Sequence, residues 1–174
     1  MRQVVVATFD ADAPELALLR DALEDVATAA GMELRWQAGR SDDADAFRAA
    51  VRAAGADDVL VIVAHGRDPA TRNGTVSTGR PSAIVESVDD LLPSEPAAGM
   101  ILLHVCYQGL PGNIEHWLRK ARPGSTVLAT AHGSGHAFPR LVAGVLSGDV
   151  PTTASARVPT QLPRQWWRWR AFHV

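Results

Sequence analysis

The chain has 174 residues, enough for one hydrophobic core and too few for two domains of ordinary size. It is 47% hydrophobic and 21% charged, with a formal net charge of -2, which argues against disorder and against a general nucleic-acid binder. The single cysteine excludes an internal disulfide, and no apolar run approaches the roughly 18 residues of a transmembrane helix. With no signal peptide visible, we expect one cytoplasmic domain over 1–174 that binds neither nucleic acid nor membrane.

Buried strands and amphipathic helices alternate along the chain. The pattern predicts strands at 4–9, 32–36, 59–64, 101–105 and 126–131, and helices at 12–30, 41–54, 84–91, 113–121 and 138–146. Alternating polar residues make 32–36 an edge or half-exposed strand, and the Gly-, Asn- and Thr-rich segment 67–80 is a loop or small hairpin. This order indicates an α/β fold, a doubly wound, mostly parallel sheet with helices on both faces.

The C-terminal segment, 151–174, departs from this rhythm and carries interleaved Trp and Arg. Such residues can stack on single-stranded nucleic acid or lie at a membrane surface, but we favour an extended segment followed by a closing edge strand. In a strand, alternate side chains share a face: Trp167, Trp169 and Ala171 on one, and Trp166, Arg168, Arg170 and Phe172 on the other. The first set carries no charge, so we expect it to face the core.

Two buried strands end in reactive side chains followed by glycine. The strand at 59–64 leads into His65-Gly66, and the strand at 101–105 leads into Cys106-Tyr107-Gln108-Gly109. Ligands of open parallel sheets bind beyond the carboxyl ends of the strands. A cysteine and a histidine brought there from separate strands are a candidate nucleophile and base, which favours a thiol-dependent hydrolase.

These two blocks resemble the caspase-like cysteine peptidases (clan CD), and most closely the CHAT-domain branch. That family has a hydrophobic strand ending in His-Gly and a later one ending in Cys-x-x-Gly, in this order. After the cysteine it has a helix, a strand, a helix and a closing strand with a Trp-x-x-Phe pattern, which Trp169-Arg170-Ala171-Phe172 fits. The resemblance covers nearly the whole chain and implies the caspase-like fold.

The resemblance also implies roles for individual residues. Cys106 would be the nucleophile of a thiol protease, His65 the acid–base catalyst, and the N–H groups of Gly66 and Cys106 the oxyanion hole. We place His104, Asp10 and His132 around the substrate pocket; His104 has the alternative of a histidine packed beneath the site. The implied function is cleavage of a protein or peptide substrate through an acyl-enzyme, without cofactor or metal, in a bacterial stress or defence system that also includes a regulatory protein partner.

Two other functions fit parts of the same pattern. A caspase-like domain without catalysis would serve as an interaction scaffold, although retention of both His65 and Cys106 argues against this. The alternative of a zinc site would use His104, Cys106, His132 and His136, whose spacing matches no strong zinc signature. His116 and His173 are expected to be ordinary surface and terminal residues.

Overall fold

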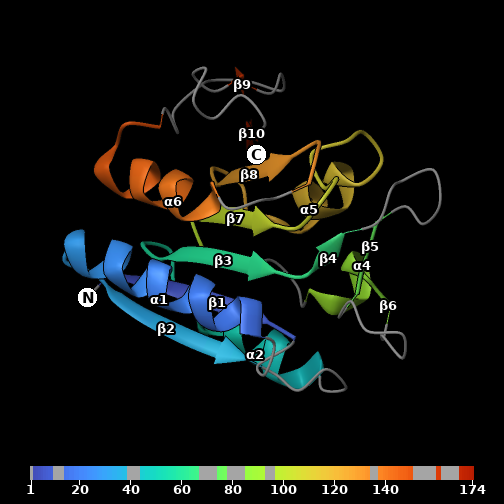
Figure 1. Ribbon diagram of the computed structural model, residues 1–174. Coiled ribbons are helices and arrows are strands. Elements are labelled where there is room, and N and C mark those ends of the chain that lie inside the picture. The colour runs from blue at the N-terminus through green and yellow to red at the C-terminus, as the bar shows by residue number, and fades with distance from the viewer. Residues whose placement is uncertain are drawn as a thin grey trace.

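A seven-stranded sheet forms the centre of the computed structural model (Figure 1). The structure describes residues 2–9, 14–38, 44–66, 74–77, 85–92, 97–133, 137–150, 160–161 and 169–174. In order across the sheet, the strands are β2 (Glu33–Ala38), β1 (Gln3–Thr8), β3 (Val59–Val63), β7 (Met100–His104), β8 (Thr126–Thr130), β10 (Trp169–His173) and β9 (Thr160–Gln161). The first five run parallel, whereas β10 is antiparallel to both of its neighbours. The prediction of a mostly parallel α/β sheet is confirmed.

Helices cover both faces of this sheet and enclose two hydrophobic clusters. On one face, α1 (Pro14–Ala29) and α6 (Phe138–Ser147) pack against alternate strand residues such as Val4 and Val6. On the other, α2 (Ala44–Ala53), α4 (Val88–Leu91) and α5 (Ile114–Lys120) pack against Val5 and its equivalents. Because both faces are buried, the inner strands are largely apolar, and β3 is apolar at every position.

A small antiparallel sheet extends from the carboxyl end of β3. It consists of β4 (His65–Gly66), β5 (Thr75–Ser77) and β6 (Val85–Ser87), in that order. In Figure 1 the arrowheads of β3 and β7 point toward this small sheet. Of the loop or small hairpin predicted at 67–80, the structure describes residues 74–77, which contain β5; this strand pairs with the two residues of the His-Gly motif.

The closing strand is present but differs from the prediction in two respects. Trp169 and Ala171 are buried on the α1/α6 face, as expected, while Arg170 is exposed. Phe172 is also buried, on the opposite face, because that face of the sheet is covered too. The prediction of an edge strand is wrong, since β9 pairs with the outer side of β10. Residues 162–168, and with them Trp166, Trp167 and Arg168, lie outside the described part.

Glycines in the left-handed conformation end two of the helices. Gly31, with φ 67°, follows α1, and Gly148, with φ 81°, is the C-cap of α6. This conformation costs glycine little and closes the last turn. The end of the helix predicted at 12–30 agrees with α1, whereas residues 12 and 13, at its predicted start, lie outside the described residues.

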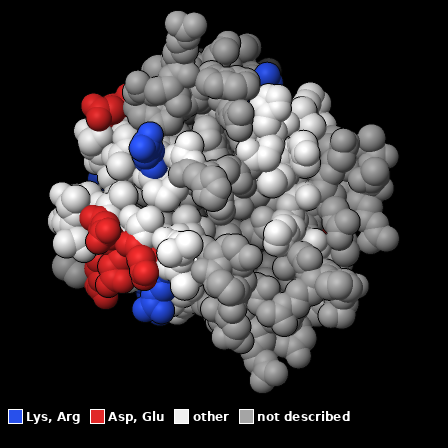
Figure 2. Space-filling view, viewed as in Figure 1, with Lys and Arg blue, Asp and Glu red and all other residues white. Residues whose placement is uncertain are grey.

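The described surface carries its charges unevenly. Figure 2 shows acidic side chains gathered over α1, where Asp21, Glu24 and Asp25 are exposed.

Across the described ranges, no helix combines the length and the apolar character needed to cross a membrane.

Candidate active site

His65 and Cys106 follow two neighbouring strands at the same level. β3 and β7 are paired in parallel, with Val63 opposite His104. His65 lies two residues beyond the first of these and Cys106 two beyond the second. The His65 residue is exposed and Cys106 is partly exposed, so both are accessible from the carboxyl edge of the sheet.

The main chains of Gly66 and Cys106 are in direct contact. A Cβ atom built on Gly66 would overlap the carbonyl oxygen of Cys106 and lie 2.6 Å from its carbonyl carbon and 2.9 Å from its nitrogen. Real Cβ atoms do not approach other heavy atoms so closely. Only glycine therefore fits at position 66, and the His-Gly segment lies directly against the residue that carries the thiol.

The turn after β7, residues 106–110 (the Cys106 turn), has an unusual backbone conformation. Tyr107 has φ 63°, the only positive φ of a non-glycine residue in the described part of the chain. Three main-chain hydrogen bonds fix the turn: Tyr107 N–H to His132 O (3.1 Å), Leu110 N–H to Tyr107 O (3.2 Å) and Gly109 N–H to Thr130 O (2.8 Å). A strained residue held by its surroundings is typical of functional sites.

Gly109 has a packing role of its own in this turn. A Cβ on Gly109 would lie 2.9 Å from the carbonyl carbon of Thr130. The glycine of the Cys-x-x-Gly block thus lets the turn lie directly against the end of β8.

Two buried side chains, those of Gln108 and Trp117, support the carbonyl of Cys106 through hydrogen bonds in series. Gln108 is fully buried; its Nε2 donates to Cys106 O at 3.2 Å, and its Oε1 accepts from Nε1 of Trp117 at 2.7 Å. Trp117 lies on α5 and is 2% exposed. Sequence reasoning gave Gln108 no role, because a polar residue between Cys106 and Gly109 does not reveal its partner.

A second buried amide connects the same turn to the small sheet. Asn113 is fully buried; its Nδ2 donates to Tyr107 O at 3.1 Å, and its Oδ1 accepts from Gly74 N–H at 2.8 Å. From sequence, an asparagine directly before a helix indicates a cap. Its contact with Gly74, 39 residues earlier, has no sequence signal.

His104 lies beneath the site and is neutral at pH 7. Its ring packs against Phe138 of α6, with centroids 4.4 Å apart. Burial, together with the nearby charge of His65, lowers the pKa of His104 from 6.5 to about 4. Among the described residues, its buried Nδ1 has no hydrogen-bond partner.

Of the other two residues predicted to line the substrate pocket, the structure describes only His132. His132 is exposed in the loop after β8, beside the Cys106 turn, where its carbonyl accepts from Tyr107. Asp10 lies outside the described residues. β1, which precedes it, is paired with β3, with Thr8 opposite Val63.

His116 is part of an ionic cluster, which sequence reasoning did not foresee. Its Nδ1 lies 2.6 Å from Oδ2 of Asp89, and Arg119 contacts the same carboxylate oxygen at 3.0 Å. Burial acts to raise the pKa of Asp89, but the hydrogen bonds and charges of His116 and Arg119 outweigh it and lower that pKa. The expectation of an ordinary surface histidine is wrong, because α5 packs beside α4 and brings these residues together.

His173, expected to be an ordinary terminal residue, contacts Thr126 Oγ1 through Nδ1 at 3.0 Å.

In the described part of the chain, no group of metal-binding side chains accompanies His65 and Cys106. Within the described ranges, no three His, Cys, Asp or Glu side chains are grouped to hold a metal; His136 lies outside them.

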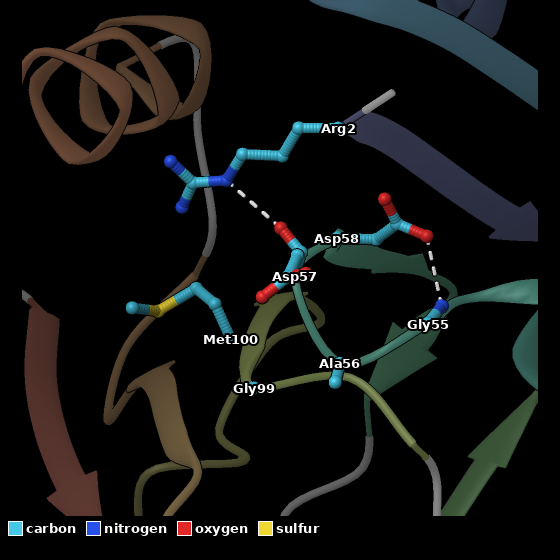
Figure 3. A pocket seen from close by; sticks show the side chains of 7 residues that line it. All are labelled: Arg2, Gly55, Ala56, Asp57, Asp58, Gly99 and Met100. Carbon is cyan, nitrogen blue, oxygen red and sulfur yellow. Dashed lines mark hydrogen bonds between the residues drawn. The ribbon is translucent and has the colours of Figure 1, made fainter.

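A cavity of about 700 Å³ lies at the opposite edge of the sheet, lined by Arg2, Gly55, Ala56, Asp57, Asp58, Gly99 and Met100 (Figure 3). There Asp58 accepts main-chain hydrogen bonds from Gln3 and Gly55, both at 2.8 Å, and ties the start of β1 to the turn before β3.

Comparison with protein families, with characterised proteins and with solved structures gives no match for this chain.

Proposed function

We propose that this protein is a cysteine endopeptidase of the caspase-like type, in which His65 and Cys106 form the catalytic dyad. The observation that carries the proposal is the contact between the main chains of Gly66 and Cys106. It joins the His-Gly and Cys-x-x-Gly blocks, which are 41 residues apart (106 − 65). A peptide carbonyl bound at this edge would lie near the thiol of Cys106, the imidazole of His65 and the main-chain N–H groups of Gly66 and Cys106.

The chemistry follows from these groups. The Cys106 thiolate attacks the carbonyl carbon of the scissile peptide bond, and the oxygen that gains negative charge is stabilised by the N–H groups of Gly66 and Cys106. The C–N bond then breaks, and His65 gives its proton to the leaving amine. Water, deprotonated by His65, hydrolyses the thioester, releases the carboxylic acid and regenerates the thiol.

The order of elements supports the caspase-like assignment. Cys106 is followed by α5, β8, α6, the two-residue strand β9 and the closing β10, which carries Trp169 and Phe172. Apart from β9, this is the order that the resemblance to CHAT domains implies.

The surroundings of Cys106 suggest what the substrate pocket accepts. His104 is neutral at pH 7 and packs on Phe138, so it offers no charge to a substrate side chain. Tyr107, next to the nucleophile, is 38% exposed. We propose that the residue preceding the scissile bond is recognised without a counter-charge from His104, with His132 at the rim of the pocket.

The proposal is tested by covalent labelling and by proteolysis. The purified protein is incubated with a set of peptidyl acyloxymethyl ketones, and in parallel with a peptide library whose new termini are identified by mass spectrometry. We expect labelling at Cys106 and a defined cleavage pattern, both lost in Cys106→Ala and reduced at least about 100-fold in His65→Ala. Near-full cleavage by either variant, with circular dichroism unchanged, would remove the dyad from the mechanism.

A further inference from the structure

The side chain of Asn113 joins the two segments that carry the proposed dyad. Its Nδ2–H donates to the carbonyl of Tyr107, the residue after Cys106. Its Oδ1 accepts the N–H of Gly74, which directly precedes β5.

The contact at Gly74 is transmitted to His65 through the small sheet. β5 begins at the residue after Gly74 and pairs with β4, with Ser77 opposite His65 and Val76 opposite Gly66. The carbonyl of Gly74 accepts from Val88 N–H at 2.8 Å, so this point is also held from α4. A displacement of Gly74 therefore displaces the strand on which β4 is built.

Asn113 does not act as a helix cap, although it occupies the N-cap position of α5. Its side chain makes no capping hydrogen bond, and its backbone has φ -80° and ψ -49°. An N-cap asparagine ordinarily satisfies one of the first N–H groups of its helix. Here both polar atoms of the amide contact other segments instead, and a fully buried amide placed in this way fixes those segments relative to each other.

We infer that Asn113 is a positioning residue, which holds His65 at the correct place relative to Cys106 by linking the Cys106 turn to the β4–β5 hairpin. This inference rests on the proposed function. It requires that loss of Asn113 weakens the influence of His65 on the thiol. A purely structural role would instead reduce stability and change the reactivity of the thiol by the same factor with and without His65.

The test is a double-mutant cycle that uses the single cysteine as its own reporter. The second-order rate of alkylation of Cys106 by iodoacetamide at pH 7 is measured by intact-mass spectrometry in the full chain. The four proteins are the natural chain, His65→Ala, Asn113→Ala and the double variant. A second cycle replaces Asn113→Ala by Asn113→Asp, which keeps the size and an acceptor for Gly74 but lacks the donor to Tyr107. Each cycle compares rates with and without His65, so the direct effect of the new carboxylate on the thiol cancels.

We expect His65→Ala to slow alkylation about tenfold in the natural background, because an imidazolium neighbour favours the thiolate. In both Asn113 backgrounds we expect this effect to fall below about threefold. The matched control is Ser125→Ala, which removes a buried hydrogen bond to Arg122 at the opposite edge of the sheet and should leave the tenfold effect intact.

Two results would contradict the inference in different ways. A tenfold effect of His65→Ala that persists in Asn113→Asp overturns the positioning role and leaves the dyad standing. No effect of His65→Ala in the natural chain overturns the proposed function, and the inference falls with it. Asn113→Asp decides the matter if Asn113→Ala does not fold, as judged by circular dichroism and thermal unfolding.

Discussion

Gly66 and Cys106 meet main chain to main chain where β4 leaves the edge of the central sheet. The constraint on residue 66 is one of space, because Gly66 is not among the glycines with positive φ. The atoms that a Cβ would meet are the backbone O, C and N of Cys106, which have no side-chain freedom to move away. The glycine after His65 therefore sets the distance between the two halves of the site.

We predict that Gly66→Ala lowers peptidase activity at least about 100-fold, since a displacement of about 1 Å in an active site has an effect of this size. The added methyl group must push β4, and with it His65, away from Cys106. Cleavage of the best peptide from the library, with circular dichroism as a check on folding, measures the effect.

The matched control for this variant is Gly133→Ala. Gly133 lies in the loop after β8, on the same side of the molecule, and a Cβ there would meet no atom of the described residues within 4 Å. We expect Gly133→Ala to retain the activity of the natural chain. Equal activity of the Gly66 and Gly133 variants would show that the contact has no bearing on catalysis.

The hydrogen bond between Trp117 and Gln108 predicts a non-additive effect on stability. Trp117→Phe leaves Oε1 of Gln108 without its donor, and Gln108→Leu leaves Nε1 of Trp117 without its acceptor; each orphaned buried group costs about 1–3 kcal/mol. The double variant removes both groups, so its free energy of unfolding in urea should exceed the additive expectation by about 1 kcal/mol or more. Strict additivity would mean that the pair is not coupled.

Burial of neutral His104 predicts a loss of stability in mild acid. Its pKa is lowered from 6.5 to about 4 on folding, first by burial and then by the charge of His65. The unfolded chain therefore binds the proton more tightly, and stability falls as pH drops from about 6.5 toward 4. Between pH 7 and pH 5 the loss amounts to about 2 kcal/mol.

His104→Phe provides the measurement of this effect, because it keeps an aromatic ring against Phe138 and removes the titrating group. Urea unfolding at pH 7 and at pH 5 gives the loss of stability for each protein, and the other titrating groups cancel in the comparison. The variant should lose about 2 kcal/mol less than the natural chain. An identical pH dependence in both proteins would show that His104 does not titrate as its burial requires.

The sequence predicts which strands carry the site, but not the side chains that hold its turn in place. Continuous apolar runs identify β3 and β7 because both faces of these strands are buried, and parallel strands bring their carboxyl ends to one edge. Those two facts bring His65 and Cys106 to the same edge, and the pairing of β3 with β7 makes their segments neighbours. The roles of Gln108 and Asn113 do not, because each depends on a tertiary contact that periodicity cannot encode.

The closing strand shows the same limit at the other side of the sheet. Its alternation predicts the buried face of Trp169 and Ala171, but β9 contributes only two residues, too few to form a pattern. The covered edge of β10 and the burial of Phe172 therefore could not be anticipated.

The last prediction concerns the contribution of β10 to the whole fold. Trp169 is 4% exposed, and its ring lies 5.4 Å from that of Phe138, while Phe172 fills the cluster on the opposite face. Deletion of 165–174 removes an aromatic from both clusters and leaves β8 without its antiparallel neighbour. We expect the truncated chain to unfold or aggregate, and Trp169→Ala alone to cost about 3 kcal/mol.

Arg170→Ala is the matched control, because Arg170 is an exposed residue of the same strand. Its Tm should stay within a degree or two of that of the natural chain, since a surface substitution away from such contacts changes stability by about 0.5 kcal/mol or less. Thermal unfolding followed by circular dichroism compares the three variants with the natural chain. A truncated chain with an unchanged Tm would show that the segment is an appendage, and the alternatives of nucleic-acid stacking and membrane association for its Trp and Arg residues would then have to be tested.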